Sequence, residues 1–289
     1  MARKRATLTD LLNDLTFKTL YNKYKMIACS AHEWQGLPEC IKEKHIEQFL
    51  FHYGKAVFFK DPTMSFMCLQ TFENGKQNVY AEPLGYRAVG VGYQRNLSAE
   101  KCVIVENNLL RLNTHDFIMF YVNKLTEAER TMDVNVKSVK TPTVFACDDK
   151  DLLTFKRIFQ MVDGNTPAIF ADKGLNLDSI QAYKTGATFM GNDLMDYKKS
   201  VENELLTFLG FNNMAVDKKE RVNVEEATSN NQLIGAFAEL QLSSRMQACE
   251  AINNMYGLEV SVRRRSLEEV LSHVDDNHER NQQTHAGTT

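Results

Sequence analysis

The sequence predicts an α+β fold that is predominantly helical, with two small strand-containing units inserted between long helices. Apolar residues recur at helical spacing over several long stretches. Short apolar or alternating runs cluster between residues 55 and 113, and a second group lies within residues 140–190. At 289 residues, the chain can bury a sizeable core as one large domain or two small ones.

Residues 1–31 are predicted to form a basic N-terminal arm and a first long helix. Three basic side chains precede any apolar pattern, which is typical of a mobile terminal arm: Arg3, Lys4 and Arg5. Leucine and aromatic residues then recur at helical spacing as far as Ala31. A second helix is expected to begin at Pro38, which suits a first helical turn, and to end near Gly54.

The segment 55–113 is predicted to form a small β-rich unit. Its apolar or alternating runs are AVFF, MSFMCL, NVYAE, YRAVGVGY and KCVIVEN. The runs KDPT, ENGK and RNLS separate them and have the composition of turns.

A long helix is expected over residues 114–139, capped by Asn113 or Thr114. Its apolar stripe is predicted to consist of Phe117, Phe120, Tyr121, Leu125, Ala128 and Met132. The dipeptide Thr141-Pro142 ends this helix. The runs TVFAC and PAIFA, with an amphipathic helix between them, then predict a compact strand, helix, strand unit within residues 140–190.

Two further long helices are predicted, over about 192–209 and 231–257, and a glycine closes each of them. The first has a near-heptad apolar pattern: Leu194, Val201, Leu205 and Phe208. The charged segment between the two helices lacks an apolar anchor and is expected to be a long loop. Beyond it, LEVSV predicts a strand, Ser266 and Glu269 form a capping box for a short helix, and the polar C-terminal end is expected to be disordered.

The composition excludes a protein that coats itself in nucleic acid. Lys and Arg number 34 against 37 Asp and Glu, for a net charge of −3, so any DNA contact must be local. The 6 cysteines include no C-x-x-C pair and favour free buried thiols over a disulfide scaffold. No apolar run approaches the roughly 18 residues needed to cross a bilayer, and the N-terminus lacks an apolar signal core. We therefore expect a soluble protein with no membrane partner.

No catalytic, metal-binding or cofactor-binding constellation is predicted. His45 and His52 lie seven apart on one expected helix face, but no third ligand recurs nearby. The run HEWQ lacks the second histidine of a zinc-protease motif, and DDKD lacks the glycine and the closing glutamate of a calcium loop. The lone glycine pair at Gly90 and Gly92 has neither the third glycine nor the helix of a dinucleotide site. The sequence therefore favours a non-enzymatic protein.

Eight ordered stretches carry a resemblance to a known family. They are HYGKAVFFKDPTMSF, NNLLRLNTHDFI, VKTPTVFACDDKDLLTFKRIF, GNTPAIFA, DSIQAYKTGA, NELLTFLGFNN, KKERV and SRMQACEAINNMYGLEVSV. Their order and spacing over roughly residues 40–265, with the MARKR start, closely resemble the portal proteins of phi29-like small podoviruses. These proteins are also called head-tail connectors or upper collar proteins.

The resemblance implies a ring-forming portal fold. It divides the chain into a basic N-terminal arm and first helix (1–31), a wing with a β-rich SH3-like unit (32–113), a stem helix (114–139), an α/β clip (140–190), a second stem helix (191–210), a channel loop (211–230), a long wing helix (231–257), and a crown with a disordered C-terminal tail (258–289). The implied function is a dodecameric ring at one capsid vertex. Double-stranded DNA is packaged and ejected through this ring, and the tail attaches to it.

The resemblance also implies partners and a location. The partners are further copies of the chain, double-stranded DNA in the channel, the major capsid and scaffolding proteins, a packaging ATPase, and the lower collar or tail proteins. Whether a packaging RNA takes part is open. The protein is expected at the portal vertex of the virion, after assembly in the cytoplasm of the bacterial host.

Particular basic residues are implied to contact nucleic acid. Lys184, in AYKTG, matches a channel-facing lysine of the family, whereas Asp193 stands where a second family lysine occurs. The channel loop carries three basic residues among acidic ones: Lys218, Lys219 and Arg221. The basic arm at residues 3–5 resembles the arm that holds packaging RNA in phi29-like members, and it could equally grip DNA or the motor protein.

A function of another class fits part of the sequence. A cytosolic helical regulator could bind DNA or RNA through the basic arm, but no recognition-helix pattern supports it. The size of the assembly separates the two hypotheses, because a portal forms a ring of about twelve subunits and a regulator a monomer or dimer. A third hypothesis, a hydrolase, has no residues to which the chemistry could be assigned.

Overall fold

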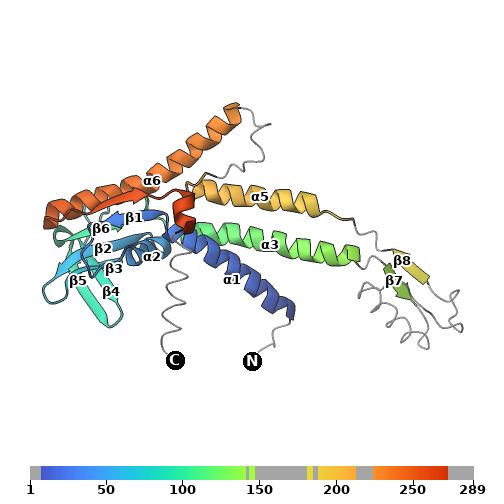
Figure 1. The fold of residues 1–289 in the computed structure, drawn as a ribbon. Coiled ribbons are helices and arrows are strands. Elements are labelled where there is room, and N and C mark those ends of the chain that lie inside the picture. The colour runs from blue at the N-terminus through green and yellow to red at the C-terminus, as the bar shows by residue number, and fades with distance from the viewer. Residues whose placement is uncertain (1–7, 141–142, 147–180, 185–187, 213–223, 273–289) are drawn as a thin grey trace, which may run out of the picture. The chain divides into compact units, whose positions relative to one another are not determined.

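The computed structural model describes residues 8–140, 143–146, 181–184, 188–212 and 224–272 (Figure 1). The chain divides into two compact units. The first comprises Met1–Glu127 and Lys198–Thr289, and the second comprises Ala128–Tyr197. No helix in the described part of the chain combines the length and the apolar character needed to span a bilayer.

The helices and strands alternate along the chain much as the sequence predicts. In order, they are α1 (Leu8–Cys29), β1 (His32–Gln35), α2 (Glu43–Tyr53), β2 (Lys55–Asp61), β3 (Ser65–Glu73), β4 (Gly85–Gly90), β5 (Tyr93–Ser98), the 3-10 helix η1 (Ala99–Lys101), β6 (Cys102–Glu106), α3 (His115–Lys140), β7 (Thr143–Ala146), β8 (Gln181–Lys184), α5 (Gly191–Phe208), α6 (Val224–Tyr256) and β9 (Ser261–Arg264). The prediction of a mixed fold dominated by long helices is confirmed.

The β-rich part of the first unit is a five-stranded antiparallel sheet in the order β5-β4-β3-β2-β6. Strand β2 lies between β3 and β6, and its Phe58 pairs with Cys68 on one side and Val103 on the other. Successive residues Val57, Phe58 and Phe59 are all fully buried. Since side chains alternate between the faces of a strand, both faces of β2 are covered. Its edge strands, β5 and β6, are not paired with each other, so the described strands form an open sheet.

Two details of the predicted sheet are wrong. The run NVYAE is a turn, because the Asn78 side chain accepts hydrogen bonds from the backbone N–H groups of Tyr80 and Glu82 at 2.9 and 3.0 Å. Such local bonds compete with strand pairing. The run RNLS belongs to strand β5, because Gly92, with a φ of 68°, helps make the hairpin turn just before it.

A second, two-stranded sheet pairs β1 with β9 in antiparallel register, with Trp34 opposite Val262. Strand β1 has the sequence HEWQ, which was compared only with a zinc-protease motif, and no strand was predicted there. The strand predicted from LEVSV begins later, at Ser261. This pairing brings the C-terminal part of the first unit against the segment that follows α1.

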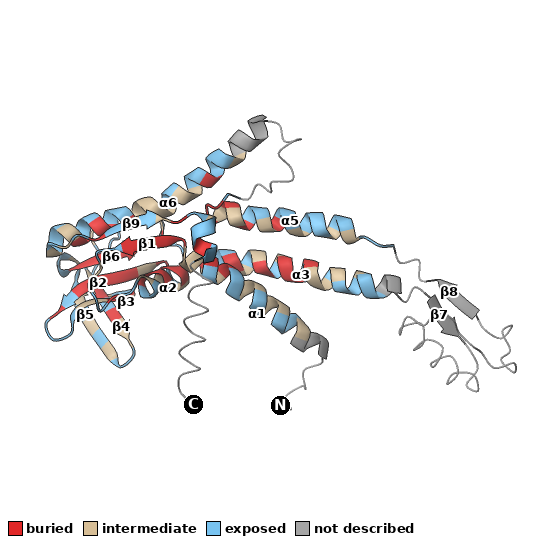
Figure 2. Ribbon diagram, viewed as in Figure 1, coloured by how far each residue is buried: buried red, intermediate tan, exposed pale blue. Residues whose placement is uncertain are grey.

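The core of the first unit has two large clusters (Figure 2). One packs α2, the sheet and α6 together and includes Leu50, Phe58 and Ile252. The other packs α1 against α3 and α5, and its fully buried members include Ile118, Val122, Leu125 and Leu205. Of the predicted α3 stripe, Leu125 and Ala128 are buried and Tyr121 packs against this cluster, whereas Phe117 and Phe120 are substantially exposed. The prediction is therefore wrong for the first two residues of the stripe. Helix α3 carries apolar residues on two faces, and their spacing alone does not indicate which face packs against the core.

The predicted glycine ends of three helices are confirmed, whereas the predicted start of α2 is wrong. Gly54, Gly210 and Gly257 all adopt left-handed φ values of 65–74° just after α2, α5 and α6. Helix α2, however, begins at Glu43. Pro38 lies in the preceding turn, where its carbonyl accepts a hydrogen bond from the N–H of Ile41.

The cap of α3 and the final capping box are confirmed. The Asn113 side chain accepts a hydrogen bond from the N–H of Asp116 at 2.9 Å. Ser266 and Glu269 exchange backbone-to-side-chain hydrogen bonds at 2.7 and 3.2 Å, and residues 267–272 are helical. Helix α6 starts at Val224, so residues 224–230 of the predicted loop are helical.

The second unit contains the antiparallel pair β7-β8, in which Thr143 lies opposite Lys184. The start of α5 is joined to α3 by the Asn135 side chain, which donates to the carbonyl of Thr188 at 2.9 Å and accepts from the N–H of Met190 at 3.0 Å. The helix and the PAIFA strand predicted within 140–190, and the C-terminal tail predicted to be disordered, lie outside the described residues.

Candidate nucleic-acid interface

The predicted nucleic-acid contacts fall mostly outside the described residues. Lys184 is the last residue of β8. The basic arm and the basic residues of the predicted channel loop are not described: Arg3, Lys4, Arg5, Lys218, Lys219 and Arg221. The structure does describe both ends of that loop, at residues 212 and 224, and the contacts that hold its N-terminal end.

The end of α5 is held tightly against α6 before the loop begins. Gly210 and Phe211 donate backbone hydrogen bonds to Thr207 and Leu206, both at 2.9 Å, which closes the helix. A Cβ atom added at Gly210 would lie 2.9 Å from the Cα and Cβ atoms of Ala238 in α6. Only glycine fits this approach, and its left-handed φ also favours glycine.

Arg264 of β9 caps the same end of α5. Its guanidinium donates to the carbonyl of Leu209 and lies 4.8 Å from the ring centroid of Phe211. Burial, together with the nearby charge of Arg245, lowers the pKa of Arg264 to about 10. The side chain still carries its charge at neutral pH, where a cation at a helix C-terminus is favourable.

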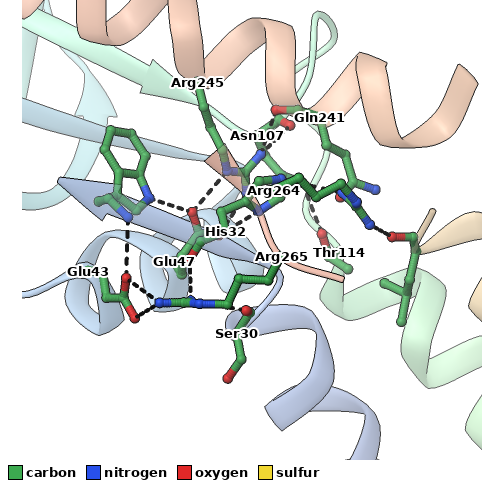
Figure 3. A network of polar contacts seen from close by, with 12 residues as sticks. Ser30, His32, Glu43, Glu47, Asn107, Thr114, Gln241, Arg245, Arg264 and Arg265 are labelled. Carbon is green, nitrogen blue, oxygen red and sulfur yellow. Dashed lines mark hydrogen bonds and ion pairs between the residues drawn. The ribbon is translucent and has the colours of Figure 1, made fainter. Parts of the chain in front are cut away.

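A buried ion pair between Arg245 and Glu47 joins α6 to α2 (Figure 3). Arg245 donates from Nε and Nη2 to the two carboxylate oxygens of Glu47, at 2.9 and 2.8 Å. The same guanidinium donates to the backbone and side-chain oxygens of Asn107 at 3.1 and 3.0 Å, and to the carbonyl of Gln241 at 2.9 Å. Trp34 donates its indole N–H to Glu47 at 2.9 Å. Burial alone would raise the pKa of Glu47, but the Arg245 guanidinium outweighs it and holds that pKa well below its usual range.

His32 completes the network and is 1% exposed. Its Nδ1 lies 3.7 Å from the Glu47 carboxylate, beyond hydrogen-bonding distance, and its Nε2 lies 3.5 Å from Arg264. Burial and the charge of Arg245 lower the pKa of His32 to about 4. His32 is therefore neutral at pH 7 and packs among three charged groups.

Arg265 ties the end of α1 and the start of α2 to the same region. It donates to the carbonyls of Ser30 and His32 at 3.1 and 2.7 Å and to both carboxylate oxygens of Glu43 at 3.0 and 3.1 Å. None of these positioning arginines was predicted from the sequence. The one available signal was the RRR run in the SVRRRS segment, which follows an alternating strand pattern and so must turn at least one arginine inward.

The two helices predicted to form the stem are close to electrically neutral. Helices α3 and α5 together carry six Lys or Arg against eight Asp or Glu. A surface of this kind makes few strong phosphate contacts, because each Lys or Arg contact adds salt-dependent affinity for DNA.

The described residues contain no metal-binding cluster, and burial deactivates three of their thiols. The same residues contain no group of three or more His, Cys, Asp or Glu side chains that could hold a metal ion. Burial raises the pKa of Cys29, Cys68 and Cys249 to about 12, whereas a nucleophilic thiol needs a lowered pKa. The five described cysteines are free, but Cys40 is exposed, contrary to the expectation that all are buried.

Comparison with known proteins assigns the family. The family model described as Phage Connector (GP10) matches residues 3–268. Among solved structures, the chain is similar to one in the portal and tail of native bacteriophage P68, at 15% identity over 92% of this chain and 93% of that one, with a TM-score of 0.49. It is also similar to a chain of the virion of a native gene transfer agent particle, at 10% identity over 95% and 87%, with a TM-score of 0.48.

A further similar structure is an HK97 family phage portal protein from Corynebacterium diphtheriae, at 10% identity over 94% of this chain and 99% of that one, with a TM-score of 0.42. The assignment rests on the family model, which spans nearly the whole chain. The chain belongs to the phage connector family.

Proposed function

We propose that this connector is the portal subunit of a bacteriophage. Twelve copies form a ring at one vertex of the capsid, double-stranded DNA enters and leaves the head through the ring, and the tail attaches to it. Family membership over residues 3–268 is the observation that carries this proposal.

The parts of the ring correspond to segments of the chain. We assign residues 32–113 to the wing, with the five-stranded sheet as its SH3-like unit, and residues 140–190 to the clip. Helices α3 and α5 form the stem, the segment before α6 forms the channel loop, and the residues after 257 form the crown. Because the described part of α6 begins at Val224, we shorten the loop to residues 211–223.

The charge distribution supports a channel through which DNA slides. The near-neutral stem helices avoid the continuous phosphate pairing that would trap the duplex. A few rings of basic residues then hold the DNA. They consist of Lys184 and of the loop residues Lys218, Lys219 and Arg221. The loop can apply that grip because its N-terminal end is fixed by Arg264 and by the close contact of Gly210 with α6.

The partners follow from this location in the virion. The ring contacts the major capsid and scaffolding proteins during assembly in the host cytoplasm, the packaging ATPase during filling, and the lower collar or tail proteins afterwards. The ATPase supplies the chemical energy, and the connector itself is not an enzyme. The basic arm at residues 3–5 holds nucleic acid or the motor at the narrow end, and a packaging RNA is one candidate ligand.

A packaging reaction tests the proposal. Heads assembled from the phage's capsid and scaffolding proteins, with or without this connector, are given the packaging ATPase, ATP and genomic DNA. We expect DNase-protected, genome-length DNA only in heads that contain the connector. Equal protection in heads that lack it would refute a role as the DNA channel.

A further inference from the structure

One surface of the first unit gathers aromatic and aliphatic side chains from three helices. We name it the aromatic face, and it consists of Phe117, Phe120 and Tyr121 of α3, Phe208 of α5, and Leu233, Phe237 and Leu240 of α6. The rings of Phe117 and Phe208 stack with centroids 4.4 Å apart, and Phe208 meets Phe237 edge-on at 5.6 Å. Phe120 meets Tyr121 edge-on at 5.2 Å and forms a second ring pair beside Phe117 on α3.

Much of this aromatic face is open to solvent in the single chain. Phe120 is 56% exposed, Leu233 51% and Leu240 52%. A groove of about 390 Å³ runs between α3, α5 and α6, with Tyr121, Phe208 and Phe237 in its walls. Contiguous apolar surface of this kind marks an interaction site more often than isolated exposed residues do.

The sequence of α6 also indicates that this helix is covered on more than one side. Residues 233–242 read LIGAFAELQL and contain one charged residue, Glu239. Ile234 is buried against the chain's own structure, whereas Leu233 and Leu240 are exposed. A helix with apolar residues around most of its circumference is stable in water only when other structure covers those faces.

The opposite side of the first unit presents the outward face of α1. Leu15 and Met26 are 61% and 44% exposed there, three helical turns apart on one stripe, and Lys18 and Lys23 lie on either side of that stripe. Tyr24, on the other side of α1, is buried and donates to Glu202 of α5 at 2.6 Å.

The α1 contacts and the aromatic face lie on different sides of α3 and α5. Helical residues two apart point about 200° from each other. Glu202, which contacts α1, and Glu204, which lines the groove, are two apart on α5. His115, which meets Tyr21 of α1, and Phe117 of the aromatic face are two apart on α3.

The charges on the two faces are complementary. Two acidic side chains, Asp116 and Glu204, border the aromatic face, together with Lys124, whose ammonium lies 4.5 Å from the Phe120 ring. The outward face of α1 is flanked by Lys18 and by Lys23, and Lys23 also pairs with Glu202 of the same chain at 2.8 Å. An aromatic surface with an acidic border therefore faces one way, and an apolar stripe with a basic border faces the other.

We propose that the aromatic face of one copy packs against the outward face of α1 of a second copy. This inference rests on the proposed function, since it names the contact that closes the portal ring. Two unlike faces on opposite sides of a subunit make a head-to-tail contact, which leads to a ring when the rotation closes and cannot end at a two-fold dimer. Phe120 and Leu233 lie at the centre of the contact, and Lys18 approaches Asp116 or Glu204 at its edge.

Paired variants test this directly by native mass spectrometry. Phe120→Asp blocks the aromatic face and leaves α1 intact, whereas Leu15→Asp blocks α1 and leaves the aromatic face intact. We expect each variant alone to be a folded monomer, because one blocked face prevents every contact in the ring. When mixed, they should form a one-to-one heterodimer through their two intact faces. Val91→Asp, at a fully exposed hairpin turn, is the matched control and should form rings like the wild type.

The other outcomes overturn the proposal. Rings formed by either blocked variant alone would show that its face is not used, and folded monomers that do not pair on mixing would show that the two faces do not meet. If circular dichroism shows that a variant is unfolded, Leu233→Asp and Met26→Asp replace it on the same two faces. Wild-type rings with unaffected variants would refute this contact and leave the portal function intact, whereas a monomeric wild type would refute both.

Discussion

Arg245→Met removes the cation that compensates the buried charge of Glu47. Arg245 makes two hydrogen bonds to Glu47, two to Asn107 and one to Gln241, and both members of the ion pair are at most 3% exposed. Methionine fills a large part of the same volume but can donate none of these bonds. Glu47 would keep only the indole N–H of Trp34 as a donor within hydrogen-bonding distance.

The expected loss in the free energy of unfolding is about 3 to 5 kcal/mol, the usual cost of leaving one partner of a buried ion pair uncompensated. Domains are commonly stable by only about 5 to 15 kcal/mol, so this is a large fraction of the total. Most of the cost arises from Glu47 rather than from lost attraction. The double variant Arg245→Met with Glu47→Leu should therefore be more stable than the single variant.

The assay is urea denaturation at pH 7, with every variant at the same protein concentration because assembly also stabilises the fold. Arg263→Met is the matched control. Arg263 contacts Glu33 and Glu269, but its side chain is 50% exposed and solvent screens these pairs, so we expect a much smaller loss than for Arg245→Met.

The pH dependence identifies the cause of the loss. In the wild type the Glu47 pKa is held below its usual range, so its contribution is present above that range and is lost as the pH falls. In Arg245→Met the largest opposing charge is gone, so burial raises the Glu47 pKa and the deficit of the variant should shrink as acid protonates this carboxyl. A loss under about 1 kcal/mol, or a double variant as unstable as the sum of the two singles, would refute this reasoning.

Four further predictions concern other parts of the chain. His32→Gln should flatten the stability profile by about 3 kcal/mol between pH 6.5 and pH 4, because the unfolded His32 binds a proton there that the folded one, with a pKa of about 4, does not; equal urea-unfolding profiles would contradict this. Leu205→Ala should cost about 2 to 5 kcal/mol, since Leu205 is fully buried, and an unchanged melting temperature would count against its assigned position. Replacing residues 3–5 by alanine should preserve the ring and weaken nucleic-acid binding, most of all at low salt; unchanged low-salt binding would argue against the arm. A Gly-Ser linker in place of residues 213–223 should still allow rings but should impair genome retention in filled heads, and full retention would exclude a clamp.

The elements that carry strong local signals could be predicted from the sequence. The left-handed glycines after three helices, the Asn113 cap and the capping box at Ser266 all follow from chemistry within a few residues. The strands β2, β3 and β6 could also be predicted, because their residue types suit a buried sheet.

The features that depend on distant residues could not be predicted. Strand β1 exists because β9, more than 200 residues away, pairs with it, and HEWQ has no strand signal of its own. The orientation of α3 depended on which of two apolar faces its neighbours cover. Glu47 and Arg245 are 198 positions apart in the sequence, so the residues near each of them gave no indication that the two form a buried ion pair. The channel loop was predicted too long because the charged residues at the beginning of α6 were assigned to the loop.

Native mass spectrometry of the purified wild-type protein tests the central claim most directly. The sample is the full-length chain at micromolar concentration and moderate salt, with negative-stain images of the same preparation. The portal proposal predicts one closed assembly close to twelve times the 33.1 kDa subunit mass, seen end-on as a ring with a central channel. A monomer or dimer at every concentration would contradict it and favour a small nucleic-acid-binding regulator.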